Sequence, residues 1–228
     1  MIQMYNVSMI YPNGVKALTD VSLHVRKGDF IFLVGPSGAG KSTLTKLIFR
    51  EELPTRGQIM VNGINIARMK DKEVPYLRRK IGVIFQDFRL LPNKSVYDNV
   101  AFALEVAEAS SKEIKKLVPA VLKLVGLTNK ADMLPTELSG GEQQRVSIAR
   151  AIINNPIMII ADEPTGNLDP ETSWEIMNLL VEINKLGTTI IMATHAKDIV
   201  DGLKKRVIAI ENGRVVRDEQ KGAYGYES

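Results

Sequence analysis

One stretch decides the fold of this chain: Gly35-Pro36-Ser37-Gly38-Ala39-Gly40-Lys41-Ser42, directly after the apolar run Phe30–Val34 and before a helical pattern. This spacing is that of a phosphate-binding loop, G-x-x-x-x-G-K-[ST], which joins a buried strand to a helix. Glycines let successive backbone N–H groups converge on phosphate oxygens, and the helix N-terminus adds a favourable dipole. We expect Lys41 to neutralise the β and γ oxygens and Ser42 to hold Mg²⁺, with Thr43 one residue further along the turn. The loop therefore predicts a nucleotide-binding site.

The rest of the chain alternates strand-like and helix-like segments, which indicates an α/β fold with a largely parallel sheet. Asn62-Gly63 and Asn212-Gly213 each lie between short apolar runs, a strong signal for a hairpin. Together with the N-terminal segment, they predict antiparallel strands beside the parallel sheet. Buried strands are expected at 30–34, 81–85, 157–161 and 189–193, and the clearest helices at 112–125, 142–154 and 174–186.

A second group of residues follows the run 157–161, where Asp162 and Glu163 end the apolar strand. An aspartate at such a strand end can coordinate Mg²⁺ directly or through water, and a neighbouring glutamate can polarise an attacking water. Adjacent carboxylates point in opposite directions from an extended backbone, so the two can take separate roles. Taken alone, the pair could be an acidic cap of a following helix. Because the chain also has a phosphate-binding loop, we interpret the pair as catalytic.

A third group is Leu138-Ser139-Gly140-Gly141-Glu142-Gln143-Gln144-Arg145, at the start of a helical run. Ser139 with Glu142 three residues later predicts a capping box, which is the simplest interpretation. The glycine pair adds exposed amides at a helix N-terminus, and such amides suit an anion. Two phosphate-binding helix ends could face one nucleotide either across a subunit boundary or within a tightly folded monomer. The residues alone leave both arrangements open.

In their order and spacing these motifs resemble the nucleotide-binding subunit of ATP-binding cassette (ABC) systems, over essentially the whole chain. The resemblance implies an ATPase that uses ATP and Mg²⁺. It also implies a P-loop NTPase fold with a RecA-like parallel-sheet core, an antiparallel β subdomain and a helical subdomain. The expected single domain is 1–228, in which about 1–86 and 157–228 form the core with the β subdomain and 87–156 form the helical part.

Functional positions of the family match residues of this chain one by one. The resemblance implies that Tyr11 stacks on adenine, that Glu163 is the general base, and that His195 lies near the γ-phosphate. It also gives Lys41 a catalytic role, and Gln86 matches the glutamine that senses Mg²⁺ and the attacking water. The implied metal-binding residues are Ser42, Gln86 and Asp162. The implied nucleotide-binding residues are Tyr11, Gly35, Pro36, Ser37, Gly38, Ala39, Gly40, Lys41, Ser42, Thr43, Ser139, Gly140, Gly141, Glu142 and the interface residue Asp169.

Two kinds of partner are implied by the same resemblance. The Ser139–Glu142 segment acts on ATP held by a second subunit, so ATP is expected to join two copies head to tail as a homodimer. An integral membrane subunit is expected to dock near Gln86–Leu91, where Phe88, Leu90 and Leu91 are the candidate docking residues.

Composition limits the other possibilities. The chain has 228 residues and a formal net charge of +4. It contains no cysteine, and this excludes disulfides, thiolate metal sites and cysteine nucleophiles. No stretch has the ~20 apolar residues of a membrane-spanning helix, and the N-terminus does not have the pattern of a secretory signal. From the residues alone we therefore expect a cytoplasmic protein, and the resemblance implies that it lies peripherally on the cytoplasmic face of the bacterial plasma membrane. The basic cluster at 68–80 is diluted by acidic residues and is interpreted as a solvated face, so no direct nucleic-acid partner is expected.

Finer features resemble the bacterial cell-division branch of the family, in which hydrolysis acts through a membrane partner on peptidoglycan hydrolases. They are Phe85–Leu91, Ser95–Leu104 and the tail Arg217–Glu227. Lipoprotein-releasing, macrolide-exporting and amino-acid-importing transporters stay open as alternatives. A nucleic-acid-associated ABC ATPase is an alternative of another class, although the chain has neither the long coiled-coil insertion nor the second cassette of such proteins. A nucleotide-binding scaffold with negligible turnover is disfavoured by Glu163 and His195.

Overall fold

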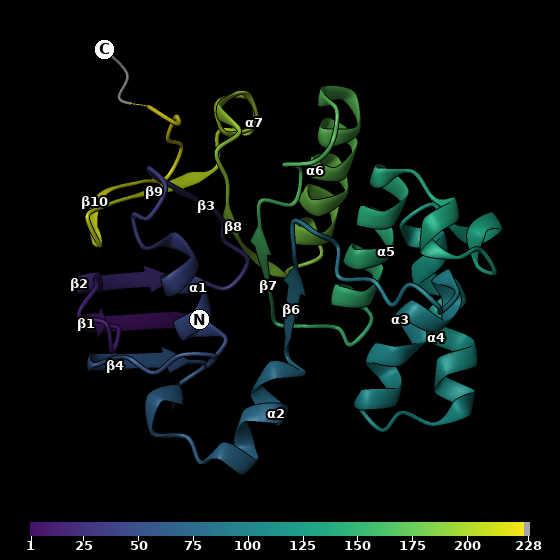
Figure 1. Cartoon of the computed structure of the whole chain (residues 1–228), viewed down its shortest axis with the longest axis horizontal. Helices are drawn as coiled ribbons and strands as arrows, with labels where there is room; N and C mark the ends of the chain where they lie inside the picture. Colours follow the sequence, from purple (N-terminus) through teal and green to yellow (C-terminus); the bar gives the residue numbers. More distant parts are fainter. Residues whose placement is uncertain (226–228) are drawn as a thin grey trace. The chain divides into compact units, whose positions relative to one another are not determined.

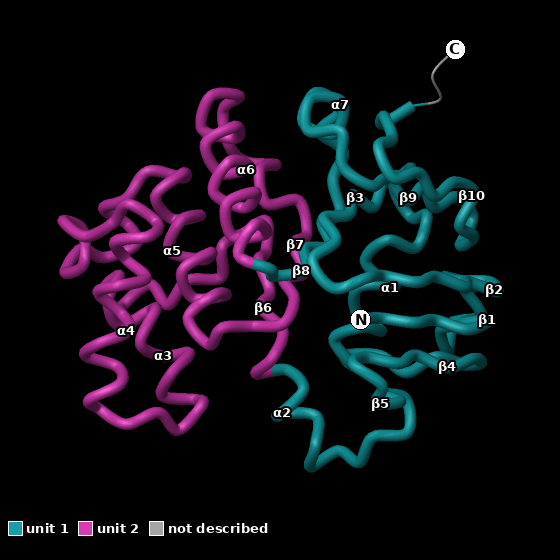
Figure 2. The backbone as a smooth tube through the Cα atoms, turned by 180° about the vertical axis from the view of Figure 1, so that it is seen from behind, with its two compact units in different colours: residues 1–78, 187–228 teal, residues 79–186 magenta. Residues whose placement is uncertain are grey.

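The computed structural model describes residues 1–225 of the chain (Figure 1). It divides into two compact units: unit 1 contains residues 1–78 and 187–228, and unit 2 contains residues 79–186 (Figure 2). The end of the tail 217–227 that carries part of the family resemblance, Tyr226 and Glu227, lies outside the described residues. Among residues 1–225, no helix combines the length and the apolar character that crossing a membrane requires.

Unit 1 contains an antiparallel sheet and a set of mixed strands. The antiparallel sheet has the strand order β2-β1-β4-β5, and the mixed strands have the order β10-β9-β3-β8. The strands of unit 1 are β1 (Ile2–Ile10), β2 (Lys16–Val25), β3 (Phe30–Val34), β4 (Arg56–Val61), β5 (Ile64–Asn65), β8 (Thr189–Ala193), β9 (Arg206–Glu211) and β10 (Arg214–Glu219). Its helices are α1 (Lys41–Ile48), α2 (Val74–Arg78) and α7 (Lys197–Leu203), with short 3₁₀ turns at Ile66–Arg68 and Asp71–Glu73.

Strand β3 lies between β9 and β8 in the mixed strands. All its residues are buried, and it runs parallel to β8 and β9, with Phe32 opposite Met192 and Val207. A short run of apolar residues buried on both faces is typical of parallel strands. The predicted strands 30–34 and 189–193 are thereby confirmed as β3 and β8.

Two tight turns join the antiparallel strands where the Asn-Gly pairs predict them. The φ angles are 49° at Asn62, 79° at Gly63, 47° at Asn212 and 73° at Gly213. Positive φ at both central residues is the geometry of the type I′ turn, which matches the twist of paired strands. Both predicted hairpins are confirmed as β4-β5 and β9-β10.

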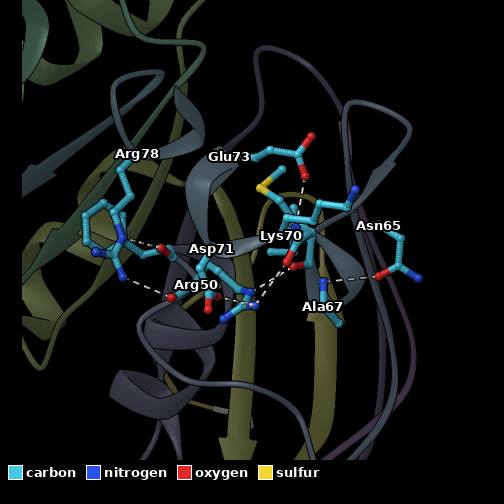
Figure 3. A network of polar contacts seen from close by, with 10 residues as sticks. Arg50, Asn65, Ala67, Lys70, Asp71, Glu73 and Arg78 are labelled. Atoms are coloured by element: carbon cyan, nitrogen blue, oxygen red, sulfur yellow. Dashed lines mark hydrogen bonds and ion pairs between the residues drawn. The ribbon is translucent and has the colours of Figure 1, made fainter. Parts of the chain in front are cut away.

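Arginine side chains hold the segment between β5 and α2 to the end of α1 (Figure 3). Arg50 donates its Nε–H to the carbonyl oxygen of Ile66 at 2.9 Å, and its guanidinium lies 3.7 Å from the carboxylate of Asp71. Arg78 donates to the carbonyl oxygen of Arg50 at 3.0 Å and lies over the ring of Phe49, 5.0 Å from its centroid. One member of the basic cluster therefore makes internal contacts.

Unit 2 combines a parallel pair of strands with helices. Strand β6 pairs with β7 from Ile81 opposite Met158 to Ile84 opposite Ala161. The elements of unit 2 are β6 (Ile81–Ile84), β7 (Met158–Asp162), α3 (Val96–Val106), α4 (Ser111–Leu124), α5 (Gly140–Ile152) and α6 (Pro170–Lys185), with 3₁₀ turns at Thr128–Lys130 and Pro135–Glu137.

The strands and helices predicted in this part of the chain are confirmed as β6, β7, α4, α5 and α6. Helices α5 and α6 begin earlier than their apolar periodicity indicates, because the side chains of Ser139 and Asp169 cap them at their N-termini. The helical content of unit 2 and the two kinds of sheet agree with the predicted α/β class. The predicted division at residues 86/87 and 156/157 stays a prediction.

Candidate active site

The phosphate-binding loop of unit 1 joins β3 to α1, and its shape depends on glycine at two positions. Gly35 and Gly40 have φ angles of 141° and 110°, which residues with a side chain rarely adopt. A Cβ on Gly40 would lie 2.5 Å from the carbonyl oxygen of Ala17, and a Cβ on Gly35 would clash with the carbonyl oxygen of Ile210. Backbone conformation and neighbouring chain therefore both require glycine there.

Lys41 lies folded over its own loop. Its Nζ donates to the carbonyl oxygens of Gly35 at 2.8 Å and Pro36 at 3.0 Å, and the residue is 8% exposed. These contacts hold a positive charge at the loop, where a phosphate group would need it. Next to it, Ser42 is exposed at the first turn of α1, so its hydroxyl is accessible to a ligand.

Tyr11 lies beside the same turn of α1. Its hydroxyl is 3.2 Å from Oγ1 of Thr43, and its backbone closes a turn through the N–H of Gly14, which donates to the Tyr11 carbonyl at 2.9 Å. The partly buried ring is therefore fixed near the phosphate-binding loop, as its predicted nucleotide contact requires.

His195 reaches the same edge of unit 1 as the loop because β3 and β8 are parallel. Leu33 lies opposite Ala193, and the N–H of Thr194 donates to the carbonyl oxygen of Leu33 at 3.2 Å. The loop starts directly after β3 and His195 shortly after β8, at the carboxyl ends where α/β sheets bind their ligands. The exposed His195 has its Nδ1 3.4 Å from the hydroxyl of Tyr224, a neighbour that the sequence motifs do not indicate.

In unit 2, β7 ends at Asp162 and the chain turns at Glu163. Glu163 has a φ of 47°, and its carbonyl oxygen accepts a hydrogen bond from the N–H of Gly166 at 3.1 Å. The expectation of an extended backbone therefore holds for Asp162 and not for Glu163. A left-handed conformation costs a non-glycine residue about 1–2 kcal/mol. Such strain concentrates at functional sites, where the surrounding structure imposes it.

Gln86 follows β6 and contacts the turn that Glu163 starts. Its Nε2 lies 3.4 Å from Oδ1 of Asn167, and Nδ2 of Asn167 donates to the carbonyl oxygen of Gln86 at 3.1 Å. A Cβ on Gly166 would lie 3.0 Å from the Gln86 Nε2, so glycine allows this close approach. Unit 2 thus brings together the predicted glutamine and the turn after the predicted general base.

A buried glutamine connects α5 to the same turn. Nε2 of Gln144 donates to the carbonyl oxygen of Pro164 at 2.6 Å, and Gln144 has no exposed surface. The sequence motifs assign no role to Gln144, which lies within Leu138–Arg145, or to Asn167, which lies two residues before Asp169. One signal could have indicated each residue. Gln144 is an amide side chain on the buried face of a predicted helix, where it needs a hydrogen-bond partner, and Asn167 is an amide side chain in a predicted turn.

The predicted capping box at the start of α5 is confirmed. The N–H of Ser139 donates to Oε2 of Glu142 at 2.9 Å, and the N–H of Glu142 donates to Oγ of Ser139 at 3.3 Å. The Ser139 N–H holds the pKa of Glu142 below its usual value, and Lys130, 3.1 Å from the carboxylate, acts in the same direction. The N–H groups of Gly140 and Gly141 have no acceptor within the helix, as at every helix N-terminus.

Asp169 caps the start of α6. Its Oδ1 accepts a hydrogen bond from the N–H of Thr172 at 2.9 Å, and Pro170 occupies the first position of the helix. Hydrogen bonds from the side chain and the N–H of Thr172 hold the pKa of Asp169 below its usual value. The carboxylate of this exposed residue is therefore directed at the helix N-terminus.

Gly141→Ala is expected to destabilise the protein by about 1–3 kcal/mol because it overpacks the contact between α5 and α6. A Cβ on Gly141 would clash with Cγ2 of Thr172, whereas a Cβ on Gly140 would lie 3.3 Å from the flexible Cδ2 of Leu168. Denaturant unfolding of both variants measures the effect, with Gly140→Ala as the milder control. Equal stability of Gly141→Ala and the wild type would contradict the close approach of Gly141 to Thr172.

The predicted site residues thus fall into two sets. Unit 1 contains Tyr11, the loop with Lys41, Ser42 and Thr43, and His195; unit 2 contains Gln86, Asp162, Glu163, Ser139–Glu142 and Asp169. The first set supplies a cation, hydroxyls and backbone N–H groups, which suit phosphate oxygens. The second set supplies carboxylates and an amide, which suit a metal ion and a water molecule.

Known proteins resemble the chain over both units. Residues 18–166 match the family described as ABC transporter. The chain is 61% identical to the cell division ATP-binding protein FtsE of Bacillus subtilis (strain 168) over 225 residues, which are 99% of either chain. It is 58% identical to FtsE of Streptococcus pneumoniae serotype 2 (strain D39 / NCTC 7466) over 226 residues, 99% of this chain and 98% of the relative.

A solved structure with a similar fold is a dimeric ATP-binding cassette in a post-hydrolysis state bound to ADP and Pi. Its TM-score with this chain is 0.87 at 37% sequence identity, and the alignment covers 98% of this chain and 100% of that one. That structure is of a cassette after hydrolysis, with ADP and Pi bound, which is the chemistry predicted for the site residues.

Proposed function

The chain belongs to the ABC transporter family, and on this premise we propose that it drives a membrane partner in bacterial cell division and the control of peptidoglycan hydrolysis. It is an ATPase with the P-loop α/β fold of the family. The observation that carries the cell-division role is the similarity over nearly the whole chain to relatives named cell division ATP-binding proteins. The membrane partner would be an FtsX-like permease.

The proposed nucleotide-binding residues of unit 1 are Gly35 to Thr43 together with Tyr11. The N–H groups of the exposed residues Ser37 and Gly38 and the hydroxyl of Ser42 offer donors to the phosphates, and Lys41 adds its charge from within the loop. The ring of Tyr11 stacks on the adenine, a contact worth roughly 1–3 kcal/mol by analogy with base stacking. The hydrogen bond between Tyr11 and Thr43 supports this role because it fixes the ring beside the loop.

The proposed Mg²⁺ ligands are Ser42, Gln86 and Asp162. Among residues 1–225, no group of three His, Cys, Asp or Glu side chains is arranged to hold a metal ion. A hydroxyl, an amide and a single carboxylate offer oxygen ligands, which fit a metal ion that is bound together with nucleotide phosphates, the usual mode for Mg²⁺. When bound, the ion neutralises charge on the phosphoryl group that is transferred.

Hydrolysis is assigned to Glu163, Gln86 and His195. The carboxylate of Glu163 takes a proton from the attacking water, and Gln86, whose position is set by Asn167, orients that water. His195 donates a hydrogen bond to the γ-phosphate, and Lys41 offsets its negative charge. The strained backbone at Glu163 supports the assignment, since strain of this kind persists where function requires a fixed geometry.

Two copies of the chain are proposed to close around ATP. The exposed Ser139 and the N–H groups of Gly140 and Gly141 would bind the γ-phosphate of ATP that is held by the second copy, with Glu142 and Asp169 beside them at the interface. ATP would then stabilise the dimer by mass action, and hydrolysis would let it open. The dimeric, post-hydrolysis neighbour bound to ADP and Pi supports this arrangement.

The loop 86–91 is proposed to dock the membrane subunit, which would place the chain peripherally on the cytoplasmic face. Phe88 and Arg89 have φ angles of 58° and 49°, and the guanidinium of Arg150 donates to the carbonyl oxygens of Phe88 at 2.8 Å and Arg89 at 2.6 Å. Asn99 holds Leu91 through hydrogen bonds of 2.7 and 3.1 Å to its N–H and carbonyl groups. The loop is irregular, its backbone is held by Arg150 and Asn99, and it carries partly exposed apolar side chains. These properties suit a rigid docking surface.

Purification of the tagged chain from membranes of the cells that produce it is expected to recover an FtsX-like membrane protein. Phe88→Asp and Leu90→Asp are expected to lose this protein, because a charge on the docking surface must be desolvated on binding. Leu186→Asp is the matched control, since Leu186 is 79% exposed and lies outside the docking loop. Mass spectrometry identifies the partner, and thermal unfolding checks that each variant is folded.

Recovery of a transporter subunit for lipoprotein release, macrolide export or amino-acid import would contradict the cell-division role and favour that transporter. Equal recovery with Leu90→Asp and Leu186→Asp would contradict the docking site. Salt-sensitive binding to DNA or RNA that stimulates hydrolysis would favour the nucleic-acid class instead.

A further inference from the structure

A short segment near the C-terminus, Gly222–Gly225, is fastened to other parts of unit 1. The N–H of Gly222 donates to the carbonyl oxygen of Lys205 at 3.2 Å, and the N–H of Tyr224 donates to Oδ1 of Asp201 in α7 at 2.7 Å. A Cβ on Gly222 would lie 2.9 Å from Cβ of Val207, so the segment lies close against β9. The backbone of the segment is therefore fixed at both ends.

Arg217 of β10 holds the same segment from its other side. Its guanidinium donates to the carbonyl oxygens of Ala223 at 2.7 Å and Tyr224 at 2.8 Å, and also to that of Gly225. The Arg217 side chain is only 8% exposed. A planar guanidinium that binds consecutive carbonyl groups fixes their orientation, which a lysine could not do in the same way.

The contacts of Arg217, Lys205 and Asp201 with the segment Gly222–Gly225 together form a clasp. This clasp sets the position of the Tyr224 phenol. The hydroxyl of this half-buried residue lies 3.4 Å from Nδ1 of the exposed His195. Because hydrogen bonds hold the backbone on both sides of Tyr224, the fold places its phenol beside the imidazole of His195.

We propose that Tyr224 is a positioning residue for His195: its O–H donates to Nδ1 and so keeps the proton of the neutral ring on Nε2. The inference rests on the proposed contact of His195 with the γ-phosphate. Phosphate oxygens only accept hydrogen bonds, so the ring nitrogen that faces them must carry a proton. A neutral imidazole has a single N–H, and the partner of one nitrogen decides which nitrogen carries it. A phenol that donates to Nδ1 leaves Nε2–H as the donor to the phosphate.

Nuclear magnetic resonance of the full chain tests the tautomer without requiring ATP hydrolysis. The chain has two histidines, and the other one, His24, is exposed on β2 and serves as an internal reference. At a pH at which both rings are neutral, the ¹⁵N shifts are expected to show a larger Nε2–H fraction for His195 than for His24. Tyr224→Phe removes only the hydroxyl and should bring His195 to the ratio of His24. Arg217→Ala, which releases the clasp, should do the same.

Kinetics of ATP hydrolysis test whether the contact matters for the reaction. Tyr224→Phe is expected to lower kcat by about 2- to 10-fold with KM unchanged, the effect of one neutral hydrogen bond. In a His195→Ala background the same substitution should have no further effect, because the contact that it removes is already absent. Tyr5→Phe, on the exposed face of β1, removes the same atom elsewhere and is the control.

Some outcomes would overturn the inference. An unchanged His195 tautomer in Tyr224→Phe, or an equal loss of kcat in the wild-type and His195→Ala backgrounds, would mean that Tyr224 does not act through His195. A changed His195 tautomer in Tyr224→Phe, together with normal hydrolysis in His195→Ala, would instead show that the proposed role of His195 is wrong. The inferred hydrogen bond from Nε2–H to the phosphate would then be wrong as well. The tautomer measurement thus separates failure of the inference from failure of the proposed function.

Discussion

Glu163→Gln is expected to bind ATP, to hydrolyse it at least about 100-fold more slowly than the wild type, and to accumulate as a dimer. The amide has the size and shape of the carboxylate, but it cannot accept the proton of the attacking water. Glutamine can also occupy the turn after β7, where residue 163 has a φ of 47°, at a cost similar to that of glutamate. Binding of ATP and closure of the dimer should therefore continue while the step that reopens the dimer is blocked.

Phosphate release and light scattering at saturating Mg-ATP measure the two effects of this substitution. Glu182→Gln is the matched control, because Glu182 is an exposed residue of α6 whose carboxylate pairs with Lys185 at 2.7 Å. It should hydrolyse ATP at the wild-type rate, since an exposed ion pair of this kind contributes little. If Glu163→Gln stayed monomeric with ATP bound, the sandwich dimer would be the wrong arrangement for this chain.

Lys41→Ala is expected to weaken binding of ATP by roughly 10- to 100-fold, because hydrogen bonds to a charged group contribute about 1.5–3 kcal/mol each. The ammonium group that contacts the Gly35 and Pro36 carbonyls belongs to the loop itself, so its loss removes the positive charge from the middle of the proposed phosphate site. Hydrolysis should fall with binding, because the same charge offsets the γ-phosphate in the transition state.

Calorimetry gives the Kd of the variant, and denaturant unfolding shows whether the loop is still folded. Lys46→Ala is the matched control: it removes one positive charge from the same helix, where Lys46 lies 3.7 Å from Glu51 at the surface. An unchanged Kd for Lys41→Ala would remove Lys41 from its assigned role. An equal loss in both variants would indicate a general effect of charge.

Features that depend on neighbouring residues in the chain were predicted well from the sequence. The Asn62-Gly63 and Asn212-Gly213 turns need positive φ at adjacent positions, which their residues adopt at low cost. The capping box of Ser139 and Glu142 is likewise local, since both hydrogen bonds span three residues. Apolar periodicity predicts a start for α6 at residue 174, which is too late, although Asp169 and Pro170 carry the local signal for its N-terminus.

Features that depend on distant parts of the chain were not predicted. Gln144 lies in the Leu138–Arg145 motif and Asn167 lies two residues before Asp169, but their partners, Pro164 and Gln86, are 20 and 81 residues away. Glycine at position 141 was interpreted as a source of exposed amides, whereas the structure adds a close approach to Thr172 of α6. Nothing in the residues around Tyr224 indicates that its hydroxyl meets His195, 29 residues earlier.

By itself, the sequence determined the phosphate-binding loop, the order of strands and helices, and the residue types available for ATP hydrolysis, because these follow from spacing and local conformational preference. The tertiary structure alone decided that the backbone of Glu163 has a left-handed conformation, that Asn167 holds Gln86, and that the Tyr224 hydroxyl lies beside His195. These features arise only when strands pair and helices pack, since packing imposes conformations and contacts that no short segment would adopt alone.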